Sequence, residues 1–513
     1  MVAKKEEPST GENARRSADC FAKNLWESQP IEATMRWTVT QVADAVAGKR
    51  GSGLDAMAWV AGVSIDSRTL RAGELFVAIH GPSHDGHDYV ADVFEKGAVA
   101  ALVAEPLVSR YPGWIQDRCI TVADTLGALH RLARALRKEW GKKICGITGS
   151  VGKTTTKEIL AALLGTKLRV LKSEGNFNNE YGLPLTILRL EPDHDVAVLE
   201  MGMSRPGELK RLAAIALPDV AIETRVTPAH LLNFSSVDEI ALAKRELIEG
   251  LWGPSSLAVL NADDGRVAAM AAVAPGRVLF YGVEKPAEFK AEEIEDRGAL
   301  GSSFTLVHQG KKTRLELALP GRHVVANALA ALAAASEWKI GIAEAAKVFR
   351  ELRTPAMRGE LIRFTSGFAL INDSYNSSPA ALQAMTSLLA ATPGFQRRIL
   401  AAGEMRELGP NSASLHREGG EFAGQTGKID FVVGVQGDAA EIVAGAVAAG
   451  VPRERVRFFA TPAEAAAFLV DFLRPGDLLL VKGSRSVKME RVVEAMLGRF
   501  APVDASANTG VGH

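Results

Sequence analysis

The residues best suited to chemistry in this 513-residue chain lie in one glycine-rich segment, GITGSVGKTTT at 146–156. Gly149 and Gly152 would let the backbone fold tightly around an anion, with loop N–H groups and a helix N-terminus pointing at phosphate oxygens. Lys153 would add a positive charge beside the β- and γ-phosphates, and Thr154 a hydroxyl for Mg²⁺. An apolar strand pattern precedes the segment and a helical pattern follows it, as a phosphate-binding loop requires.

The spacing of this loop is shorter than usual, because the full motif would need glycine where Ile147 stands. A glycine-rich strand–helix turn with an unrelated lysine is the alternative interpretation. Glu200 ends a later apolar strand, and His230 and Lys244 follow the next one, so all three are candidates for a metal site. Taken singly, Glu200 is as well explained as a solvated loop residue, while His230 is more often a packed or capping residue and Lys244 ordinarily a surface lysine. The residues alone therefore predict an ATP-dependent enzyme without specifying its reaction.

Three further clusters could bind a ligand, and each has a plainer explanation. The asparagine-rich EGNFNNEYGLPL (174–185) offers paired amide donors and acceptors, or is a turn-rich loop. NDSYNSSP (372–379) is a nucleotide-binding edge or an Asx-turn, and VKGSR (481–485) is a carboxylate clamp or a solvated strand end. The histidines at 80, 84 and 87 lack the spacing of a metal site, and no metal is expected there.

The composition is that of an ordinary globular protein, with 47% hydrophobic and 23% charged residues. Sixty basic and sixty acidic residues leave no net charge, so no global attraction to nucleic acid or anionic membrane is expected. Three widely spaced cysteines argue against a disulfide framework or a structural zinc site and favour a reducing cytoplasm. We find no apolar run of membrane-spanning length and no signal-peptide pattern.

Apolar strand patterns alternate with helical ones along the chain, which predicts an α/β fold with parallel sheets covered on both faces. We expect a disordered N-terminal tail (1–34), a small α/β domain (35–122), a central P-loop domain (123–355), a C-terminal Rossmann-like domain without GxGxxG (356–500) and a flexible tail (501–513). Residues 277–321 are predicted to form antiparallel strands added to one side of the central sheet.

Together the motifs resemble the Mur ligase family of peptidoglycan precursor enzymes, over about residues 35–500. The matching segments are DSR (66–68), DGHDYV (85–90), TGSVGKTTTKE (148–158), NFNNEYGLPLT (176–186), LEMGMSRPGEL (199–209), PAHL (228–231), AKREL (243–247), NADD (261–264), PGRH (320–323), NALAA (327–331), MRGE (357–360), NDSYNSSP, GEMRELG (403–409) and VKGSRS (481–486). The shortened loop is the family's own form. The asparagine block and the VKGSR ending are most similar to the branch that joins D-alanyl-D-alanine to UDP-N-acetylmuramoyl-tripeptide.

The resemblance implies ATP-dependent amide formation through an acyl phosphate. Lys153 and two magnesium ions would offset the approaching negative charges. Thr154 and Glu200 would hold one ion, while His230 and Lys244 would help hold the other, with Lys244 as a carbamate made from CO₂ because an ammonium cannot ligate a cation. Nucleotide contacts are implied at Gly149, Ser150, Val151, Gly152, Lys153, Thr154, Thr155, Asn327, Arg358, Asp373, Tyr375 and Asn376, with Arg358 also in a catalytic role.

Substrate contacts are implied at Ser67, Arg68 and His87 for the uridine diphosphate end, at Asn176, Asn178 and Asn179 for the muramoyl-peptide, and at Lys482, Ser484 and Arg485 for the dipeptide. The sequence departs from the family at Arg225, Val324 and Asn372, where asparagine, asparagine and aspartate are usual. A cytoplasmic monomer without nucleic-acid or membrane partners is expected. The alternatives are a sister ligase that adds one amino acid, a P-loop protein that binds nucleotide without ligase activity, and a small-molecule kinase.

Overall fold

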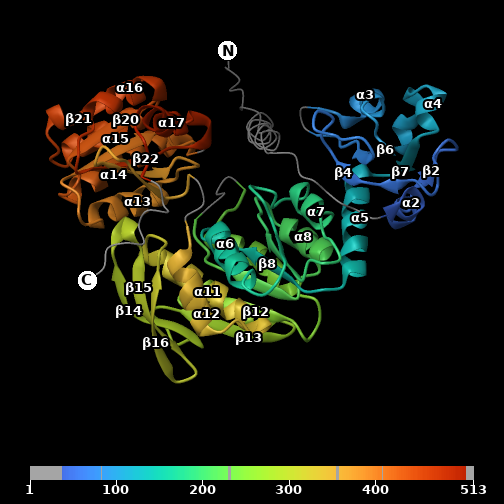
Figure 1. Cartoon of the computed structure of the whole chain (residues 1–513), viewed down its shortest axis with the longest axis horizontal. Coiled ribbons are helices and arrows are strands. Elements are labelled where there is room, and N and C mark those ends of the chain that lie inside the picture. Colours follow the sequence, from blue (N-terminus) through green and yellow to red (C-terminus); the bar gives the residue numbers. More distant parts are fainter. Residues whose placement is uncertain (1–36, 82–83, 229–232, 354–356, 407, 504–513) are drawn as a thin grey trace, which may run out of the picture. The chain divides into compact units, whose positions relative to one another are not determined.

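The computed structural model describes residues 37–81, 84–228, 233–353, 357–406 and 408–503 (Figure 1). The predicted tails, apart from 501–503, and His230 lie outside the described residues. The chain divides into two compact units, Met1–Phe289 with Leu329–Ile340, and Lys290–Ala328 with Gly341–His513. Parallel sheets with helices on their faces confirm the predicted α/β class. None of the described helices has the length and apolar character needed to span a membrane.

The first domain is built on a short, mainly parallel sheet. Its strands, in the order β2-β7-β6-β5-β4, are β2 (Lys49–Arg50), β4 (Gly62–Ser64), β5 (Glu74–Val77), β6 (Ala100–Ala104) and β7 (Cys119–Val122), with only β2 antiparallel. β1 (Trp37–Thr38) pairs with β3 (Trp59–Val60), and the helices are α2 (Val39–Val46), α3 (Val90–Glu95) and α4 (Gly113–Gln116). Successive side chains of β5 face opposite sides, so Leu75 and Val77 join the core with α2 and Phe76 the core with α3.

In the first unit the central sheet is wholly parallel, in the order β13-β12-β11-β8-β10-β9. The strands are β8 (Ile144–Thr148), β9 (Val170–Lys172), β10 (Val196–Glu200), β11 (Val220–Glu223), β12 (Leu257–Asn261) and β13 (Arg277–Gly282). Its helices include α6 (Lys153–Leu164), α7 (Gly182–Ile187), α8 (Glu208–Ala216), α9 (Val237–Glu249) and α10 (Gly265–Ala269). Helix α11 (Arg322–Ala335) belongs to the first unit from Leu329 on and to the second unit before it. Every residue of β8, β10, β11 and β12 is buried, which explains their uninterrupted apolar runs.

The prediction that residues 277–321 are all antiparallel is wrong for β13, which pairs in parallel with β12. The short helix α10 lies between these two strands and forms a crossover, and such a connection returns the chain in the same direction. The strands that follow are antiparallel as expected: β14 (Phe289–Asp296), β15 (Ser302–His308) and β16 (Lys311–Leu317).

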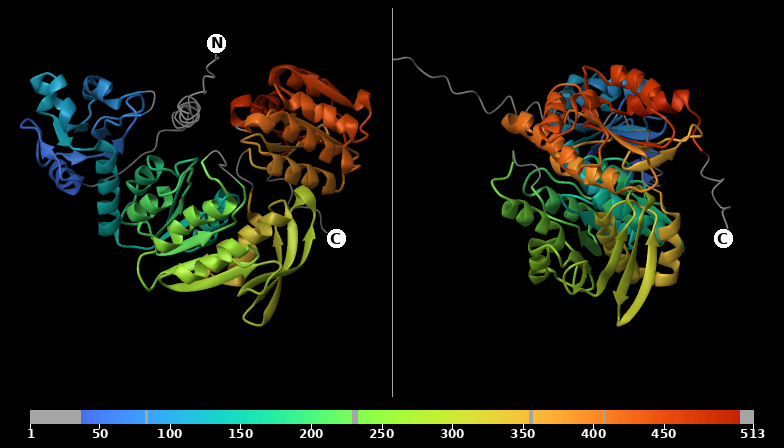
Figure 2. Two further views of the ribbon diagram at one scale, coloured as in Figure 1. Left: turned by 180° about the vertical axis from the view of Figure 1, so that it is seen from behind. Right: turned by 90° about the vertical axis from the view of Figure 1, so that its left-hand side faces the viewer.

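The C-terminal domain has a six-stranded sheet in the order β17-β18-β22-β19-β20-β21, with only β17 antiparallel. The strands are β17 (Glu360–Arg363), β18 (Ala369–Asp373), β19 (Arg397–Gly403), β20 (Phe431–Val435), β21 (Val456–Phe459) and β22 (Asp477–Lys482). The helices α13 (Pro379–Ala391), α14 (Ser412–Gln425) and α15 (Ala439–Ala448) cover one face, and α16 (Pro462–Phe472) and α17 (Glu490–Arg499) the other (Figure 2); α12 (Ile342–Glu351) precedes them.

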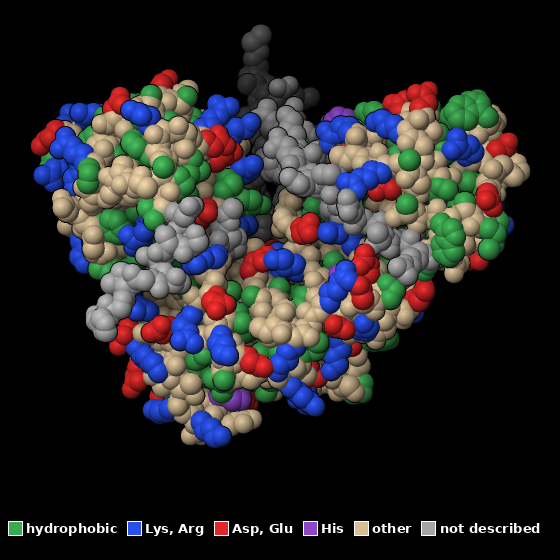
Figure 3. Space-filling model, viewed as in Figure 1, with side chains coloured by type: hydrophobic (Ala, Val, Ile, Leu, Met, Phe, Trp, Pro, Cys, Tyr) green, Lys and Arg blue, Asp and Glu red, His purple; other side chains and the backbone are tan. Residues whose placement is uncertain are grey.

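Acidic and basic side chains are interspersed over the face drawn in Figure 3, without a large field of one sign. This matches the equal numbers of acidic and basic residues in the sequence. Binding of an anionic ligand must therefore depend on local groups.

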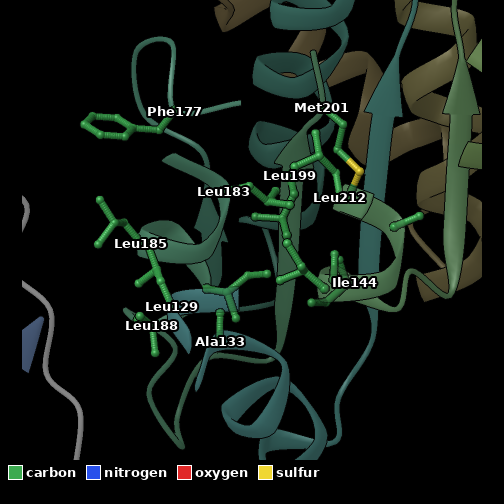
Figure 4. Close-up of a cluster of buried hydrophobic side chains, with 14 of the residues drawn as sticks. Leu129, Ala133, Ile144, Phe177, Leu183, Leu185, Leu188, Leu199, Met201 and Leu212 are labelled. Carbon is green, nitrogen blue, oxygen red and sulfur yellow. The ribbon is translucent and has the colours of Figure 1, made fainter. Parts of the chain in front are cut away.

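Helix α5 (Thr125–Trp140) belongs to the cores of both the first and the central domain. Its N-terminus is capped by Asp124, whose carboxylate accepts the N–H groups of Leu126 and Gly127. Leu129 and Ala133 pack into a cluster with residues of α7 and its end, as Figure 4 shows.

Arg137 on α5 is completely buried and ties three elements together. Its guanidinium donates to the carbonyls of Ala216 (2.8 Å) and Leu217 (3.0 Å) at the end of α8, and to Asp219 Oδ2 (2.8 Å). The same oxygen of Asp219 accepts the N–H of Ile144 at the start of β8 (2.9 Å). Removing one member of such a buried network leaves charge and carbonyl groups without partners.

We therefore predict that Arg137→Met destabilises the first unit by about 3–5 kcal/mol, measured as a lowered urea midpoint. Arg134→Met is the matched control, because Arg134 lies on the exposed face of the same helix. Equal midpoints for the two variants would contradict the role given to Arg137.

Candidate active site

The site lies at the carboxyl end of β8, where the strand order reverses. The chain leaves β8 toward β9 and β10 on one side, and later strands build outward from β11 on the other. Such a switch point opens a crevice between loops that leave in opposite directions, and it is the usual ligand-binding position of open parallel sheets. The segment that follows β8 at this point is the glycine-rich loop.

The glycine-rich loop is held against the neighbouring strand β11. Gly149 has φ +147°, and a Cβ atom there would lie 1.8 Å from Thr224 Oγ1. Thr224 Oγ1 donates to the Val151 carbonyl at 2.6 Å, and the Ser150 N–H donates to the Arg225 carbonyl at 2.7 Å. Only glycine permits this approach, and the hydrogen bonds keep the loop in one curved conformation.

The loop leads into α6 in the manner expected for anion binding. Gly152 (φ +87°) precedes the helix and offers no side-chain cap, and a helix N-terminus of this kind favours an anion. Lys153 Nζ donates to the Gly149 carbonyl across the loop at 2.8 Å. Thr154 and Thr155 are half-buried in the first turn of the helix. These groups fit a nucleotide phosphate.

Thr154 and Glu200 are in direct contact, although 46 residues separate them. Thr154 Oγ1 donates to Glu200 Oε2 at 2.8 Å, and Asn178 Nδ2 donates to Oε1 at 3.0 Å. The Glu200 N–H donates to Ser173 Oγ at 3.0 Å, which fixes the end of β10. A hydroxyl and a carboxylate of this kind are the hard oxygen donors that Mg²⁺ prefers, so the pair fits a magnesium site.

Lys244 lies on α9 and is only 3% exposed. Burial lowers the pKa of its amino group to about 8, although the nearby Glu223 carboxylate acts in the opposite direction. His230, its predicted partner in metal binding, lies outside the described residues.

Glu223 is the site residue that the sequence analysis missed. It ends β11, is fully buried, and among the described residues neither of its carboxylate oxygens has a hydrogen-bond partner. Burial raises its pKa to about 8, while the charges of Lys244 and Lys153 act to lower it. The available signal was the one that identified Glu200, a glutamate closing an apolar strand.

The three asparagines of the 174–185 block have different surroundings. Asn178 reaches Glu200, as described above, and its N–H donates to the Asn176 carbonyl at 2.7 Å. Asn179 Oδ1 accepts the N–H groups of Tyr181 (3.1 Å) and Gly182 (2.9 Å), so this side chain holds the turn that begins α7. Of the three, only Asn178 is brought to the candidate metal ligands.

The first domain carries the residues expected to bind the uridine diphosphate end. The exposed guanidinium of Arg68 lies 2.8 Å from Asp66, and the Ser67 carbonyl accepts Lys96 Nζ at 2.6 Å. Both residues lie in the segment after β4, with Arg68 open to solvent.

His87 is buried, and the protein engages both of its ring nitrogens. Nε2 accepts the Ala104 N–H at 3.0 Å, so Nδ1 carries the proton and donates to Asp85 Oδ1 at 2.6 Å. This histidine therefore anchors the 84–90 segment to β6, and any effect on a ligand acts through that segment.

The second unit carries the other expected nucleotide contacts. The Arg358 guanidinium stacks over the Tyr375 ring, 4.2 Å from its centroid. Lys482 is 2% exposed and donates to Asp373 Oδ2 at 2.5 Å and to the Asn376 carbonyl at 2.8 Å. Burial raises the pKa of Asp373 despite this ion pair. Lys482 thus fixes the strand end that carries Asp373, and its contact with the dipeptide stays a prediction.

The remaining expected contacts are spread over the second unit. Ser484 Oγ accepts the Arg406 N–H at 2.9 Å, and Arg485 pairs with Glu490 at 2.9 Å. Asn327 is buried in α11.

The three residues that depart from the family pattern have defined surroundings. Arg225 holds the loop through its backbone carbonyl, and its side chain is exposed. Val324 is buried as an apolar residue of α11, and Asn372 Oδ1 accepts the Ser374 hydroxyl at 2.7 Å.

Comparison with known proteins gives the family. Profiles described as "Mur ligase family, catalytic domain", "Mur ligase middle domain" and "Mur ligase, glutamate ligase domain" match residues 60–136, 147–335 and 357–485. A UDP-N-acetylmuramoyl-tripeptide–D-alanyl-D-alanine ligase of Bacillus subtilis is 34% identical over 460 residues, covering 90% of this chain and 98% of the relative. The chain belongs to the Mur ligase family. The Escherichia coli enzyme of the same name is 34% identical over 440 residues, covering 85% and 93%.

Solved structures of Mur ligases share the whole fold. The ligase from Acinetobacter baumannii that is named for adding D-alanyl-D-alanine superposes with a TM-score of 0.81 at 28% identity, covering 92% of this chain and all of the other. A ligase from Thermotoga maritima, in complex with ADP, gives 0.72 at 29% identity, covering 85% and 97%. The three-domain architecture predicted from the sequence is therefore confirmed.

We predict that Gly149→Ala weakens ADP binding by about 1–3 kcal/mol, roughly 5- to 150-fold, because the added Cβ would displace the loop from Thr224. Isothermal titration calorimetry measures the loss. Gly253→Ala is the control, since Gly253 also has positive φ (+86°) but has open space around its Cβ position. Unchanged ADP affinity in Gly149→Ala would show that the loop does not depend on this close approach.

Proposed function

We propose that this Mur ligase joins D-alanyl-D-alanine to UDP-N-acetylmuramoyl-tripeptide, converts ATP to ADP, and so makes the pentapeptide precursor of peptidoglycan. The observation that carries the proposal is the Thr154–Glu200–Asn178 contact beside the phosphate-binding loop. It joins the loop, the end of β10 and the asparagine block into one cluster. The proposal is further supported by relatives of this name that match nearly end to end.

The chain's own residues supply the elements that such a reaction needs. A carboxylate is a poor electrophile, and transfer of the γ-phosphate to it creates a good leaving group for attack by an amine. The curved loop orients the phosphates, and Lys153 reduces the repulsion between the substrate carboxylate and the γ-phosphate. The amine of the dipeptide then attacks the acyl carbon and phosphate leaves.

Thr154 and Glu200 are the residues that we assign to one magnesium ion. Bound there, the ion would supply charge neutralisation for the transferred phosphate. His230 and Lys244 are assigned to a second ion, with Lys244 as a carbamate. The amine nitrogen forms this group by attacking the carbon of CO₂: an N–C bond forms, a C–O π bond opens, and the nitrogen releases a proton. Burial of Lys244 supports the assignment, because its lowered pKa increases the fraction of reactive free amine at neutral pH.

The remaining contacts follow the chemistry of each ligand. Arg485, with Ser484, is assigned to the dipeptide carboxylate, and Arg68, with Ser67, to the diphosphate of the precursor. In the first unit, the loop residues Gly149 to Thr155 are assigned to the nucleotide phosphates. In the second unit, the residues assigned to nucleotide contacts are Asn327, Arg358, Asp373, Tyr375 and Asn376. Because ATP and nucleotide-linked precursors are used inside the cell, we place the enzyme in the cytoplasm, and we expect it to act as a monomer.

We predict that phosphate release requires ATP, Mg²⁺, UDP-N-acetylmuramoyl-tripeptide and D-alanyl-D-alanine together. The measurement is a coupled phosphate assay in which each component is omitted in turn, with mass spectrometry of the UDP-linked product. Lys153→Ala is expected to lose turnover while retaining the circular dichroism spectrum of the wild type. Release with the precursor and a single amino acid would instead identify a sister ligase. Conversion of ATP to ADP without an amine and without phosphate release, leaving a stable phosphorylated precursor, would identify a kinase.

We predict that Lys244→Ala loses ligase activity and that acetate partly restores it, because a free carboxylate can occupy the position of the carbamate. Activity is measured as product formation over a range of acetate concentrations. Lys153→Ala is the matched control, since acetate cannot replace a lost positive charge. Failure of every small carboxylate to restore Lys244→Ala would remove the carbamate from the proposal and leave the ligase assignment in place.

A further inference from the structure

Two oxygen-bearing side chains without partners lie side by side beneath the phosphate-binding loop. Both carboxylate oxygens of Glu223 and the Oγ1 atom of Thr148 are buried and make no hydrogen bond within the described part of the chain. Both residues are 0% exposed. An isolated buried carboxylate costs several kcal/mol or more, which is why burial raises the pKa of Glu223 to about 8. A cation bound beside it would favour its charged form.

The two side chains share one face of the sheet. β11 and β8 are parallel, with Glu223 opposite Thr148 and Ala221 opposite Gly146. Because side chains alternate along a strand, Glu223 and Thr148 point to the same side as Ala221 and a Cβ on Gly146. That Cβ would lie 3.2 Å from Leu247 of α9, so this face is the one that α9 covers.

Charged groups already surround this position. Lys244 of α9 is buried on the same side, and its charge and those of Lys153 and Asp264 act on Glu223. Neither lysine forms a hydrogen bond with the Glu223 carboxylate. Glu200, in contrast, is opposite Ile147 in the β10–β8 register, so it points to the other face, where it meets Thr154 of α6.

We propose that Glu223, together with the hydroxyl of Thr148, is an oxygen ligand for a divalent cation on the α9 face of the sheet, the cation that Lys244 faces. Carboxylate and hydroxyl oxygens are donors that Mg²⁺ accepts. A fixed protein carboxylate would hold this cation whether or not Lys244 is modified. The inference rests on the proposed function, because a reaction of magnesium nucleotide supplies the cation.

The test is a titration of the full chain with Mn²⁺, in which the electron paramagnetic resonance signal reports the free Mn²⁺. The titration is done first without nucleotide and then in the presence of ADP. Glu223→Gln keeps the shape of the side chain but removes its charge, and we expect it to lower the affinity of one site about tenfold or more. Thr148→Val removes only the unpartnered hydroxyl and is expected to weaken the same site by a smaller factor. Glu74→Gln, a buried glutamate of the first domain, is the control and should bind as the wild type does.

Mn²⁺ affinity and site number equal to those of the wild type in both folded variants would overturn the proposal and leave Glu223 as a countercharge for the lysines. If Glu223→Gln fails to fold, the Mn²⁺ affinity of Thr148→Val still tests the proposal. Removing the Thr148 hydroxyl breaks no hydrogen bond among the described residues, so this variant is expected to fold. The ligase assay on the wild type separates the two proposals. Absence of pentapeptide there would overturn the proposed function, whereas the Mn²⁺ comparison would still decide the role of Glu223.

Discussion

Buried charge at the carboxyl edge of the central sheet is the constraint on which the site depends. Glu200, Glu223 and Lys244 are almost or completely buried, and Lys153 is half-buried. Taking such groups out of water is costly unless partners are supplied. The protein supplies them for Lys153, through loop carbonyls, and for Glu200, through Thr154 and Asn178. Glu223 has none among the described residues, so ligands that complete this region should also stabilise the folded state.

Hydrogen bonds from neighbouring strands fix the end of β11, which lies beside these buried charges. The Thr224 carbonyl accepts both the Tyr281 hydroxyl (2.9 Å) and Asn261 Nδ2 (2.9 Å), which come from the ends of β13 and β12. On its other side Thr224 holds the phosphate-binding loop. Two strands, β12 and β13, therefore fix one backbone segment, and that segment fixes the loop. This explains why β12 and β13 matter to a site that neither of them enters directly.

The parts of the fold that could be predicted are those with a local cause. Buried parallel strands are uninterruptedly apolar, and the phosphate-binding loop carries its own glycines, so both can be identified in the sequence. The parallel pairing of β13 was not recognised, because it depends on a short crossover helix and a distant partner strand. Lys482 and Asp373 form a buried pair across 109 residues, and His87 meets Ala104 on another element. No local pattern distinguishes these anchoring roles from ligand binding.

In the first unit, the phosphate-binding loop and the region around Glu223 differ in how many of their polar groups already have partners. On the anion side, the loop is already curved by internal hydrogen bonds, so phosphate binding requires little reorganisation. On the cation side, the Glu223 oxygens have no partner within the described chain. A cation bound there would offset negative charge within a few residues of the loop and would favour an incoming phosphate. Since such coupling is reciprocal, nucleotide must raise cation affinity by the same factor. The buried Glu223 carboxylate would then be the group through which each ligand strengthens the binding of the other.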